Sequence, residues 1–600
     1  MNASRDSKCE ERQFSEWKAK VIEACKTGIS RRKDGKFGLG LQGKREFSNE
    51  ARQALRTMQQ SFVFVPADKA ANNITVICRQ YYQHVLRTEL TRDGGAYTGV
   101  AAGVTEETLI KQHVTELKSM HLFPTKLAKS HGNLPYLYWL PKLHKNPAGA
   151  RFIAGSASCS TTLLSVVLSS ALNLVAGALR DKSDTHMKST GVRRFWVLDG
   201  YEECSSFLHN WHRPVGDTDN RELHSGDFST MYTTIPHDDL HTRITKCIQE
   251  AFDYVREKHS DQLKDGERLI LGVYTDEDAM KVTKTEWDTL KQTHRALVHS
   301  QSYHPFTVES LSNAVRMLLN NIYMNNAGTV RRQKLGIPMG TNCAPILANL
   351  YLYSYEVEFL DGLELINELE IARRFHASFR YIDDALSVDN EYWTTFAAKC
   401  YEDGGIYPRA LVLNDTTLTP EADAVNYVGM EIRNRPPEPF TYTQRKQHEE
   451  KIELGNKLDR VYMNVFDKRK EFPFSVRRYP DMSSLIPESV PYGVFIGQLH
   501  RYYKICTEWR DFNQNSLDLG GKLLEKGCTV AKLTRAYRAF LSRMHNEASN
   551  RTNATNPTND TNRTNHRLFK ANSLQKIVWR YQRALAAIQR SLAFEHHFGK

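Results

Sequence analysis

Three aspartates flanked by strand-like sequence are the side chains of this chain best suited to chemistry. Asp383 and Asp384 lie between two apolar, β-prone segments, residues 379–382 and 385–388, and therefore occupy the turn of a predicted hairpin. An isolated Asp-Asp turn is equally compatible with simple solvation. A third aspartate far upstream, Asp227, also follows a short strand-like segment, which favours a shared site on neighbouring strands of one sheet.

Carboxylates that converge from different strands can hold two divalent metal ions about 3.5–4 Å apart. Such a pair lowers the pKa of an attacking 3′-hydroxyl and neutralises a leaving pyrophosphate, which is the chemistry of nucleotide addition. Mg²⁺ prefers oxygen ligands and keeps waters and substrate phosphates in its shell, so a few carboxylates suffice, and Mn²⁺ can substitute. We predict that Asp227 and Asp383 are the principal metal ligands, with Asp384 in support, and that all three are catalytic.

Tyr232 follows the first aspartate by five residues and is the candidate for selecting the sugar of a nucleotide. A bulky aromatic side chain in this turn would pack under the incoming sugar and clash with a 2′-hydroxyl. A tyrosine that only fills the core is the alternative. Residues 233–236, Thr-Thr-Ile-Pro, then lead into a helix predicted to begin near Pro236, because proline is favoured in the first turn.

A glycine-containing loop at residues 333–345 lies between the first aspartate and the aspartate pair. Gly336 and Gly340 would let the backbone approach a base pair closely, and the apolar residues 346–352 predict a helix beneath the template strand. A single loop of this kind is weak support for any ligand. Its position between the acids is what strengthens the prediction.

Binding a triphosphate requires cations, and residues 140–145 followed by Arg151 supply them upstream of the acids. The planar guanidinium of Arg151 would clamp phosphate oxygens, whereas Lys142 or Lys145 would act as a point charge on phosphate or template. A solvent-exposed position is the alternative for either lysine.

Composition sets bounds on the class of protein. Six hundred residues, 40% hydrophobic and 25% charged, predict a soluble globular protein of several domains. The sequence shows no run of about eighteen uncharged apolar residues and no signal peptide, so we expect an intracellular protein without a membrane partner. The ten cysteines are scattered without zinc spacing and are expected to be mostly buried small hydrophobes. A formal net charge of +12 favours a polyanionic partner without defining an activity.

The pattern along the chain predicts several segments. A strongly charged stretch at about 253–302 looks inserted within the region that carries the acids. The boundaries are those of an N-terminal extension at 1–60, a first region at 61–215, the acid-bearing region at 216–440, a basic, aromatic and helical region at 441–545, an Asn/Thr-rich linker at 546–566 and a C-terminal segment at 567–600.

The C-terminal segment has helical periodicity. Its apolar side chains recur on one face, and basic side chains occupy the other, namely Lys576, Arg580, Arg583 and Arg590. We expect a basic amphipathic helix that docks on its own protein, with binding of nucleic acid or of a partner as the alternative.

Taken in order, six motifs resemble those of the reverse transcriptases, and more narrowly those of the Penelope-like retroelement group that is related to telomerase. The similarity spans about residues 60–540. The motifs are Pro-Ala-Asp-Lys at 66–69, Leu-Pro-Lys-Leu-His-Lys at 140–145, Asp227 with Tyr-Thr-Thr-Ile-Pro at 232–236, Gly-Ile-Pro-Met-Gly at 336–340, Tyr-Ile-Asp-Asp at 381–384 and Asn-Tyr-Val-Gly at 426–429.

The resemblance implies a right-hand polymerase of the α+β class, with fingers at 61–215, a palm of antiparallel sheet and helices at 216–440 and a helical thumb at 441–545. It implies two Mg²⁺ ions, an RNA template, a DNA primer, deoxynucleoside triphosphates and nuclear residence; oligomeric state stays open. It also implies that the Phe228 carbonyl binds metal and that Met339 and Gly340 contact the nucleotide. The primer or template contacts it implies are Gly336, Pro338, Tyr381, Tyr427 and Gly429.

Two departures affect the fingers: residues 70–72 read Ala-Ala-Asn where Gly-Asn is common, and Phe152 replaces a usual proline. The tripeptide Gly-Ile-Tyr at 405–407 lies inside the predicted palm without its companion half, so we expect no GIY-YIG nuclease. One alternative is an inactive copy that only binds nucleic acid, which the presence of all three acids disfavours. Another is an RNA-dependent RNA polymerase, which generally avoids a bulky residue at the position of Tyr232.

Overall fold

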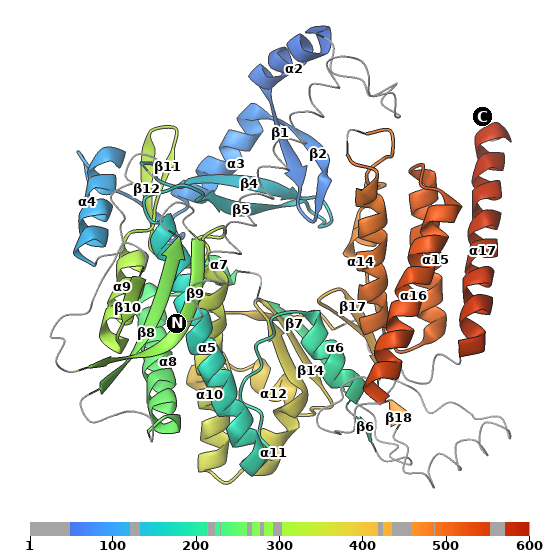
Figure 1. The fold of residues 1–600 in the computed structure, drawn as a ribbon. Coiled ribbons are helices and arrows are strands. Elements are labelled where there is room, and N and C mark those ends of the chain that lie inside the picture. The colour runs from blue at the N-terminus through green and yellow to red at the C-terminus, as the bar shows by residue number, and fades with distance from the viewer. Residues whose placement is uncertain are drawn as a thin grey trace, which may run out of the picture.

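The computed structural model describes residues 49–120, 132–210, 212–213, 222–228, 230–260, 267–276, 281–291, 303–417, 424–434, 458–459, 461–484, 486–552 and 571–598. Helices and strands are mixed along the chain, and every ladder between the named strands is antiparallel. This mixture confirms the predicted α+β class. Figure 1 shows helices α14 to α17, between residues 489 and 598, standing together on one side of the molecule, with strands β7 (Leu223–Phe228) and β14 (Asp384–Val388) near its centre.

The N-terminal part of the described chain consists of hairpins and short helices. Strand β1 pairs with β2 and β4 with β5, and their apolar sides share a small core in which the ring of Trp139 stacks on Tyr82 with centroids 4.8 Å apart. The elements are α2 (Asn49–Ser61), β1 (Phe62–Ala67), β2 (Ala70–Cys78), α3 (Arg79–Thr91), β3 (Tyr97–Gly99), α4 (Glu106–Ser119), β4 (Tyr136–Lys142) and β5 (Gly149–Gly155).

The largest core surrounds three long helices of the central part, α5 (Thr162–Thr190), α8 (His237–Lys258) and α10 (Ala344–Leu365). Helix α10 is buried on most sides, which explains why its sequence is apolar almost throughout. The other helices here are α6 (Tyr201–Asn210), α7 (Met231–Thr234), α9 (Val308–Asn320), α11 (Leu369–Arg374) and α12 (Trp393–Ala397), with single 3₁₀ turns η2 (Phe375–Ala377) and η3 (Tyr401–Asp403).

The strands of the central part form separate small sheets. One has the order β13-β14-β7-β15, and others have the orders β10-β8-β9 and β11-β12-β3. Their bounds are β6 (His212–Arg213), β7 (Leu223–Phe228), β8 (Glu267–Asp276), β9 (Lys281–Lys291), β10 (Tyr303–Phe306), β11 (Tyr323–Asn326), β12 (Thr329–Gln333), β13 (Ser378–Tyr381), β14 (Asp384–Val388) and β15 (Leu413–Asp415).

The sheet β13-β14-β7-β15 is covered on both faces. Phe228 and Ala385 belong to the largest core, whereas Leu223, Leu386 and Val388 belong to a second core shared with the sheet β16-β17-β19. Strand residues alternate between faces, so this assignment fixes which side chains emerge on each side. The remaining strands are β16 (Ala424–Tyr427), β17 (Met430–Asn434), β18 (Leu458–Asp459) and β19 (Val461–Val465).

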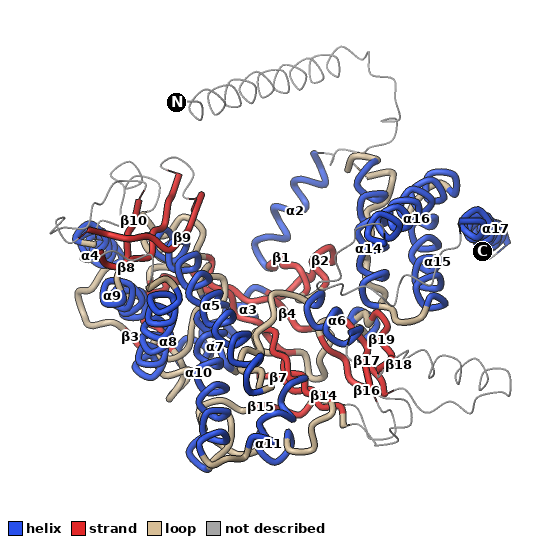
Figure 2. The backbone as a smooth tube through the Cα atoms, turned by 60° about the horizontal axis from the view of Figure 1, so that its bottom comes forward, coloured by secondary structure: helices blue, strands red, loops and turns tan. Residues whose placement is uncertain are grey.

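A helical module of four helices has its own core. Its members are α14 (Ser489–Ile505), α15 (Trp509–Glu525), α16 (Val530–Thr552) and α17 (Ala571–Phe598), and η5 (Lys468–Glu471) lies in the chain leading to it. Figures 1 and 2 both place α14 on the side of the module nearest the central sheets and α17 on the far side.

Helix α5 corrects the expectation that no segment has the character of a membrane span. Among the described residues it is the one helix long and apolar enough to cross a membrane, and 61% of its most apolar window is buried inside the protein. Its side chains from Leu163 to Leu179 supply the centre of the largest core. A core helix passes the same length and composition test, and that is the role of α5 here.

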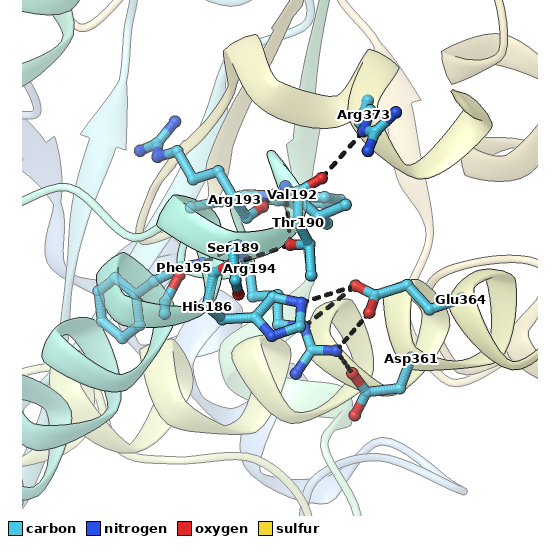
Figure 3. A network of polar contacts seen from close by, with 12 residues as sticks. His186, Ser189, Thr190, Val192, Arg193, Arg194, Phe195, Asp361, Glu364 and Arg373 are labelled. Carbon is cyan, nitrogen blue, oxygen red and sulfur yellow. Dashed lines mark hydrogen bonds and ion pairs between the residues drawn. The ribbon is translucent and has the colours of Figure 1, made fainter. Parts of the chain in front are cut away.

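Polar contacts tie the C-terminal end of α5 to α10 (Figure 3). Nε2 of His186 lies 3.0 Å from Oε1 of Glu364, and Nη2 of Arg194 lies 2.9 Å from Oε2 of the same glutamate and 2.7 Å from Oδ1 of Asp361. The side chains of His186 and Arg194 therefore share one carboxylate. This arrangement fixes the position of α5 against α10 beneath the acid-bearing sheet.

Several predicted boundaries differ from the structure. The charged insertion predicted from residue 253 begins inside α8, and β8 contributes buried side chains such as Leu271 to the largest core. Helix α16 continues to Thr552, past the predicted start of the linker at residue 546, and residues 553–570 lie outside the described part. The predicted extension at 1–60 ends with α2 at Ser61, and residues 1–48 also lie outside the described part.

Most of the cysteines in the described part are buried, as predicted. The buried ones are Cys159, Cys204, Cys247, Cys343, Cys506 and Cys528, whereas Cys78 is exposed and Cys400 is half-buried. None of those described forms a disulfide. The Gly-Ile-Tyr tripeptide at 405–407 is also part of the core, because Ile406 and Tyr407 are buried there.

Candidate active site

The structure brings the three predicted acids together at one end of the central sheet. Strand β14 pairs with β7 in a register that sets Asp384 directly opposite Asp227. Directly opposed residues in an antiparallel pair have Cβ atoms about 4.5–5.5 Å apart, on the same face of the sheet. Asp383 precedes Asp384 in the β13–β14 turn, and its carbonyl oxygen accepts a hydrogen bond of 2.9 Å from the backbone N–H of Phe228.

The turn that presents Asp383 has an unusual backbone. Tyr381 pairs with Asp384, which leaves Ile382 and Asp383 as a two-residue turn, and Ile382 has a φ of +56°. A positive φ in the first turn position is normally given to glycine, and a β-branched residue there is strained. Strain of this kind persists only where the surroundings hold it in place.

A buried arginine holds that turn from below. The guanidinium of Arg380 lies 2.5 Å from Oε1 of Glu356 on α10, and Nη1 donates to the carbonyl oxygen of Ile382 at 3.2 Å and to Oδ1 of Asn349 at 2.9 Å. Neither Arg380 nor Glu356 has side-chain surface exposed to water. The hydroxyl of Tyr407 also donates to Glu356 at 3.0 Å. A buried ion pair satisfied on every side fixes its neighbours in one geometry.

Crowding of carboxylates is visible in the electrostatics of the site. Burial raises the pKa of Asp384 to about 6, with the charges of Asp383 and Asp227 adding to the rise and Lys468 opposing it. Burial also raises the pKa of Asp383, and Asp227 adds to the effect. Like charges held together in a half-buried site disfavour full ionisation. A cation bound between these oxygens would relieve that repulsion.

Cations from distant parts of the chain surround the acids. Burial lowers the pKa of Lys142, Arg151 lowers it further, and the charges of Asp68 and Asp227 partly offset this. Nε of Arg151 lies 3.4 Å from Oδ1 of the buried Asp68, and the charge of Arg151 also acts on Asp383. Lys145, the third predicted cation, is exposed in the β4–β5 turn. The structure therefore groups Arg151 and Lys142 with the acids and leaves Lys145 at the surface.

Two further lysines of the site were not predicted. Burial lowers the pKa of Lys69, and the charge of Lys468 lowers it further. The charges of both lysines act on Asp384. Lys69 has a φ of +61° in the β1–β2 turn, directly after Asp68. Its motif was visible in the sequence. Lys468 was visible only as part of a basic cluster, because nothing local in a sequence shows which acid a distant lysine will meet.

Tyr232 lies beside the acids in a half-buried position. Its ring packs against the largest core, and burial raises its pKa, with the charge of Asp383 adding to the rise. Arg151 acts on the same hydroxyl in the opposite direction. The charges of an acid and of a cation of the site therefore both act on this side chain. Both a core-filling role and contact with a bound ligand are compatible with this place.

The two glycines of the 333–345 loop make close approaches to the protein's own backbone. A Cβ at Gly336, where φ is +78°, would lie 2.0 Å from the carbonyl oxygen of Tyr232, and one at Gly340, where φ is +108°, would lie 2.3 Å from that of Ala154. Both glycines therefore let the loop approach the protein's own backbone. The carbonyl oxygen of Met339 accepts from the N–H of Ala154 at 2.6 Å. This loop holds Tyr232 and strand β5 in place.

The remaining predicted contact residues of the loop and of the β13–β14 hairpin differ in how far they are exposed to solvent. Met339 is half-buried and Gly340 is exposed, whereas Pro338 is buried and lines a narrow cavity with Leu318 and Thr162. Tyr381 is half-buried. A buried proline is poorly placed to contact a nucleic acid directly.

The β16–β17 hairpin corrects the prediction for Tyr427. Its side chain is 1% exposed in the second core, so it supports the hairpin from within. The turn itself, Val428 and Gly429, has two positive φ angles of +45° and +75°. The carbonyl oxygen of Gly429 accepts from Nη2 of Arg501 on α14 and from the N–H of Phe466, each at 3.0 Å. The hairpin is thus joined to the helical module.

Residues 467–479 connect the helical module with the N-terminal hairpin. The side-chain amide of Asn73 donates to the carbonyl oxygen of Arg477 at 3.2 Å, and its oxygen accepts from the N–H of Arg477 at 2.8 Å. Phe472 packs against Ala67 and Ala70 beside this pair. The contact brings the β1–β2 turn, with Lys69, and the η5 turn, with Lys468, to the same acids.

The oxygen atoms at this end of the sheet suit a divalent ion that brings further ligands with it. Among the described residues, no three His, Cys, Asp or Glu side chains are grouped so that they could hold an ion by themselves. The three aspartates nevertheless offer only oxygen donors, and burial, with the neighbouring carboxylates adding to it, disfavours the charged form of Asp383 and Asp384 when no cation is present. Mg²⁺ sites of this type take one or two carboxylates and complete the shell with waters and substrate phosphates. The residues present fit an ion that binds together with a phosphate substrate.

Comparisons with known proteins give weak similarities only. No protein-family model matches the sequence, and no curated protein is similar to it at a significant level. Among solved structures, telomerase from Candida albicans in complex with a TWJ fragment of telomeric RNA aligns at 9% identity and a TM-score of 0.42, covering 89% of this chain and 69% of the other. Apo telomerase from Candida tropicalis aligns at 11% identity and a TM-score of 0.43, covering 90% and 72%. Similarities at this level do not decide what the chain does.

The raised pKa of Asp384 leads to a prediction for the metal-free protein. Because the pKa rises from 3.8 to about 6 on folding, the folded state binds more protons than the unfolded state between these values. Stability contributed by the neutral carboxyl is therefore lost as pH rises through this window. Asp384→Asn should unfold at a higher temperature than the wild type above pH 6, and the difference should close towards pH 4. Thermal melts in a chelator across this range measure it, and a difference that does not vary with pH would contradict it.

The contact between Asn73 and Arg477 gives a second prediction. Asn73→Ala removes both hydrogen bonds to Arg477, together with one to the carbonyl oxygen of Ala70 inside the hairpin. The two bonds between the segments contribute about 0.5–1.5 kcal/mol each, so separation of the segments should become about 5- to 150-fold more frequent. Hydrogen exchange measured by mass spectrometry should rise in residues 62–78 and 467–479 together. Asn173→Ala, at an exposed amide that bonds only within α5, is the matched control and should leave both segments unchanged. Faster exchange in one segment alone would show that they are not coupled.

Proposed function

We propose that this protein is an RNA-directed DNA polymerase that extends the 3′-end of a DNA primer on an RNA template. The observation that carries the proposal is the register of β7 and β14, which sets Asp227 opposite Asp384 with Asp383 in the adjoining turn. Carboxylates held this way, with lysines and an arginine around them, suit a reaction between a nucleic-acid end and a nucleoside triphosphate. The order of motifs along the sequence supports a retroelement enzyme of the Penelope-like group.

Each group of the site has a role in this proposal. When bound by Asp227, Asp383, Asp384 and the carbonyl oxygen of Phe228, Mg²⁺ would lower the pKa of the primer hydroxyl and neutralise the leaving pyrophosphate. Arg151 and Lys142 would bind the triphosphate, because their charges already act on the acids. The half-buried ring of Tyr232 would exclude a 2′-hydroxyl from the sugar site.

The proposal also assigns the parts of the fold. The region of β1 to β5 would be the fingers, the central sheet with α5, α8 and α10 the palm, and the helical module the thumb. The turn at Val428 and Gly429 would face the primer, with Tyr427 supporting it from the core. The partners would be RNA template, DNA primer and deoxynucleoside triphosphates.

A primer-extension assay tests the proposal. Purified full-length protein with poly(rA), oligo(dT), Mg²⁺ and dTTP should extend the primer. Asp383→Ala should lower the rate about 1000-fold, since loss of a ligand to the metal costs several kcal/mol of transition-state stabilisation. Asp253→Ala, at an exposed position on α8, is the matched control and should retain full activity.

Other outcomes of this assay would reject the proposal in distinct ways. Binding of the hybrid without any synthesis would favour the alternative of an inactive nucleic-acid-binding copy. Incorporation of UTP in preference to dTTP would favour an RNA polymerase. Activity that survives Asp383→Ala would remove the acids from the mechanism.

The place of Tyr232 gives a further prediction for the same assay. Tyr232→Ala opens the space under the sugar, so discrimination against ribonucleotides should fall by about 10- to 200-fold. Tyr232→Phe keeps the ring and should keep the discrimination. Competition between dTTP and UTP on poly(rA) measures the ratio of kcat/KM values. If the alanine variant discriminates as well as the wild type, the tyrosine only fills the core.

A further inference from the structure

Helix α17 is fixed in one rotation about its axis. Val578, Tyr581 and Leu585 are buried in the core of the helical module, and the ring of Tyr581 stacks on Tyr537 with centroids 3.9 Å apart. A Cβ at Gly520 of α15 would lie 2.6 Å from Cδ2 of Leu585, so α17 approaches α15 as closely as it does only because that residue is glycine. The hydroxyl of Tyr581 also donates to the carbonyl oxygen of Ser516 at 3.0 Å.

Because the face of α17 with Val578, Tyr581 and Leu585 is buried, the opposite face is turned outward, and its charged side chains are all positive. Exposed basic residues follow one another at intervals of four, three and seven, which places them on one stripe of a helix: Lys576, Arg580, Arg583 and Arg590. No acidic residue occurs between positions 571 and 594. Within the described part of the chain, none of these four side chains forms an ion pair.

An exposed aromatic ring lies beside this stripe. Trp579 is 55% exposed, although large aromatic side chains are usually well buried. The guanidinium carbon of Arg583 lies 4.7 Å from the centre of its ring. A second stripe of exposed amides runs alongside at Gln575, Gln582 and Gln589. A face that serves only for solubility does not require an uncovered tryptophan among its charges.

We propose that this outward face of α17 binds single-stranded nucleic acid, with phosphates along the basic stripe and a base stacked on Trp579. Basic side chains combined with an accessible aromatic ring are the features with which proteins bind single strands irrespective of sequence. Uniform positive charge is complementary to phosphate and unsuited to a basic or neutral partner. The amides of Gln575 and Gln582 can hydrogen-bond to bases or sugars.

The proposed surface is separate from the acids of the candidate active site. Helix α17 packs on α15 and α16, whereas α14 is the helix of the module that contacts α6 and β19. Both ribbon views place α17 on the far side of the module from the central sheet (Figures 1 and 2). If the proposed function holds, a single strand bound to α17 would lie outside the site for the paired primer and template. It would be an unpaired extension of one of these two strands.

Fluorescence anisotropy of the full-length protein tests this surface. Labelled (rU)₂₀ and (dT)₂₀ are titrated in separate arms, with saturating unlabelled RNA–DNA hybrid present to compete for the acid site. Trp579→Ala should weaken binding of at least one oligonucleotide by about 5- to 150-fold, the equivalent of about 1–3 kcal/mol for one stacked base. R580A/R583A should reduce the slope of log K against log salt by about 1.4, since each phosphate contact to a single strand contributes about 0.7.

The control removes equal charge elsewhere. K111A/K118A changes two exposed lysines of α4 and should bind both oligonucleotides like the wild type. All variants should keep the wild-type melting temperature, because none of the changed side chains is buried.

Wild-type affinity in both α17 variants would overturn the proposal. The proposal would also be overturned if heparin displaced the oligonucleotides as well as unlabelled oligonucleotide does and Trp579→Ala had no effect. A surface that recognises charge alone makes no use of bases. The readout is binding, so it stands or falls separately from polymerase activity.

Discussion

The register between β7 and β14 is the constraint on which the rest of this molecule depends. A slip of one residue would turn Asp384 and Asp227 to opposite faces of the sheet, because side chains alternate along a strand. Apolar residues further along the same strands prevent that slip. Val388 and Leu223 are paired in the same register and are buried in the second core, while Ala385 and Phe228 face the largest core. Burial on both faces thus specifies where the acids emerge.

Holding like charges together has a cost, and the fold offsets it from two directions. Below the turn, the buried pair of Arg380 and Glu356 holds the strained backbone at Ile382. Around the acids, lysines arrive from the N-terminal hairpin and from the segment that leads to the helical module. Neither group of lysines is near the acids in sequence. The contact between Asn73 and Arg477 is therefore part of the same electrostatic arrangement, since it joins the two segments that carry Lys69 and Lys468.

Local patterns predicted much of this arrangement, and non-local contacts account for what they missed. The strand–turn–strand pattern at 379–388 was sufficient to predict the turn, and the periodicity of residues 574–592 was sufficient to predict the face on which α17 packs. The close approaches of Gly336 and Gly340 could not be assigned to the protein's own backbone, because Tyr232 and Ala154 are far away in sequence. Burial of Tyr427 depends on three strands that meet only in the fold. The apolar character of α5 likewise reflects its packing against α8 and α10 in the largest core.

The positive charge of this chain acts in two physically different settings. Near the acids, Lys69 and Lys142 are partly desolvated, which lowers their pKa, and their interactions are strong because little water or salt screens them. On α17 the basic side chains are exposed, so their attraction is screened by salt within about 8–10 Å and is distributed along the helix. A net charge of +12 does not distinguish these settings. The first can orient a single phosphate group, whereas the second can retain a flexible chain of phosphates without fixing its register.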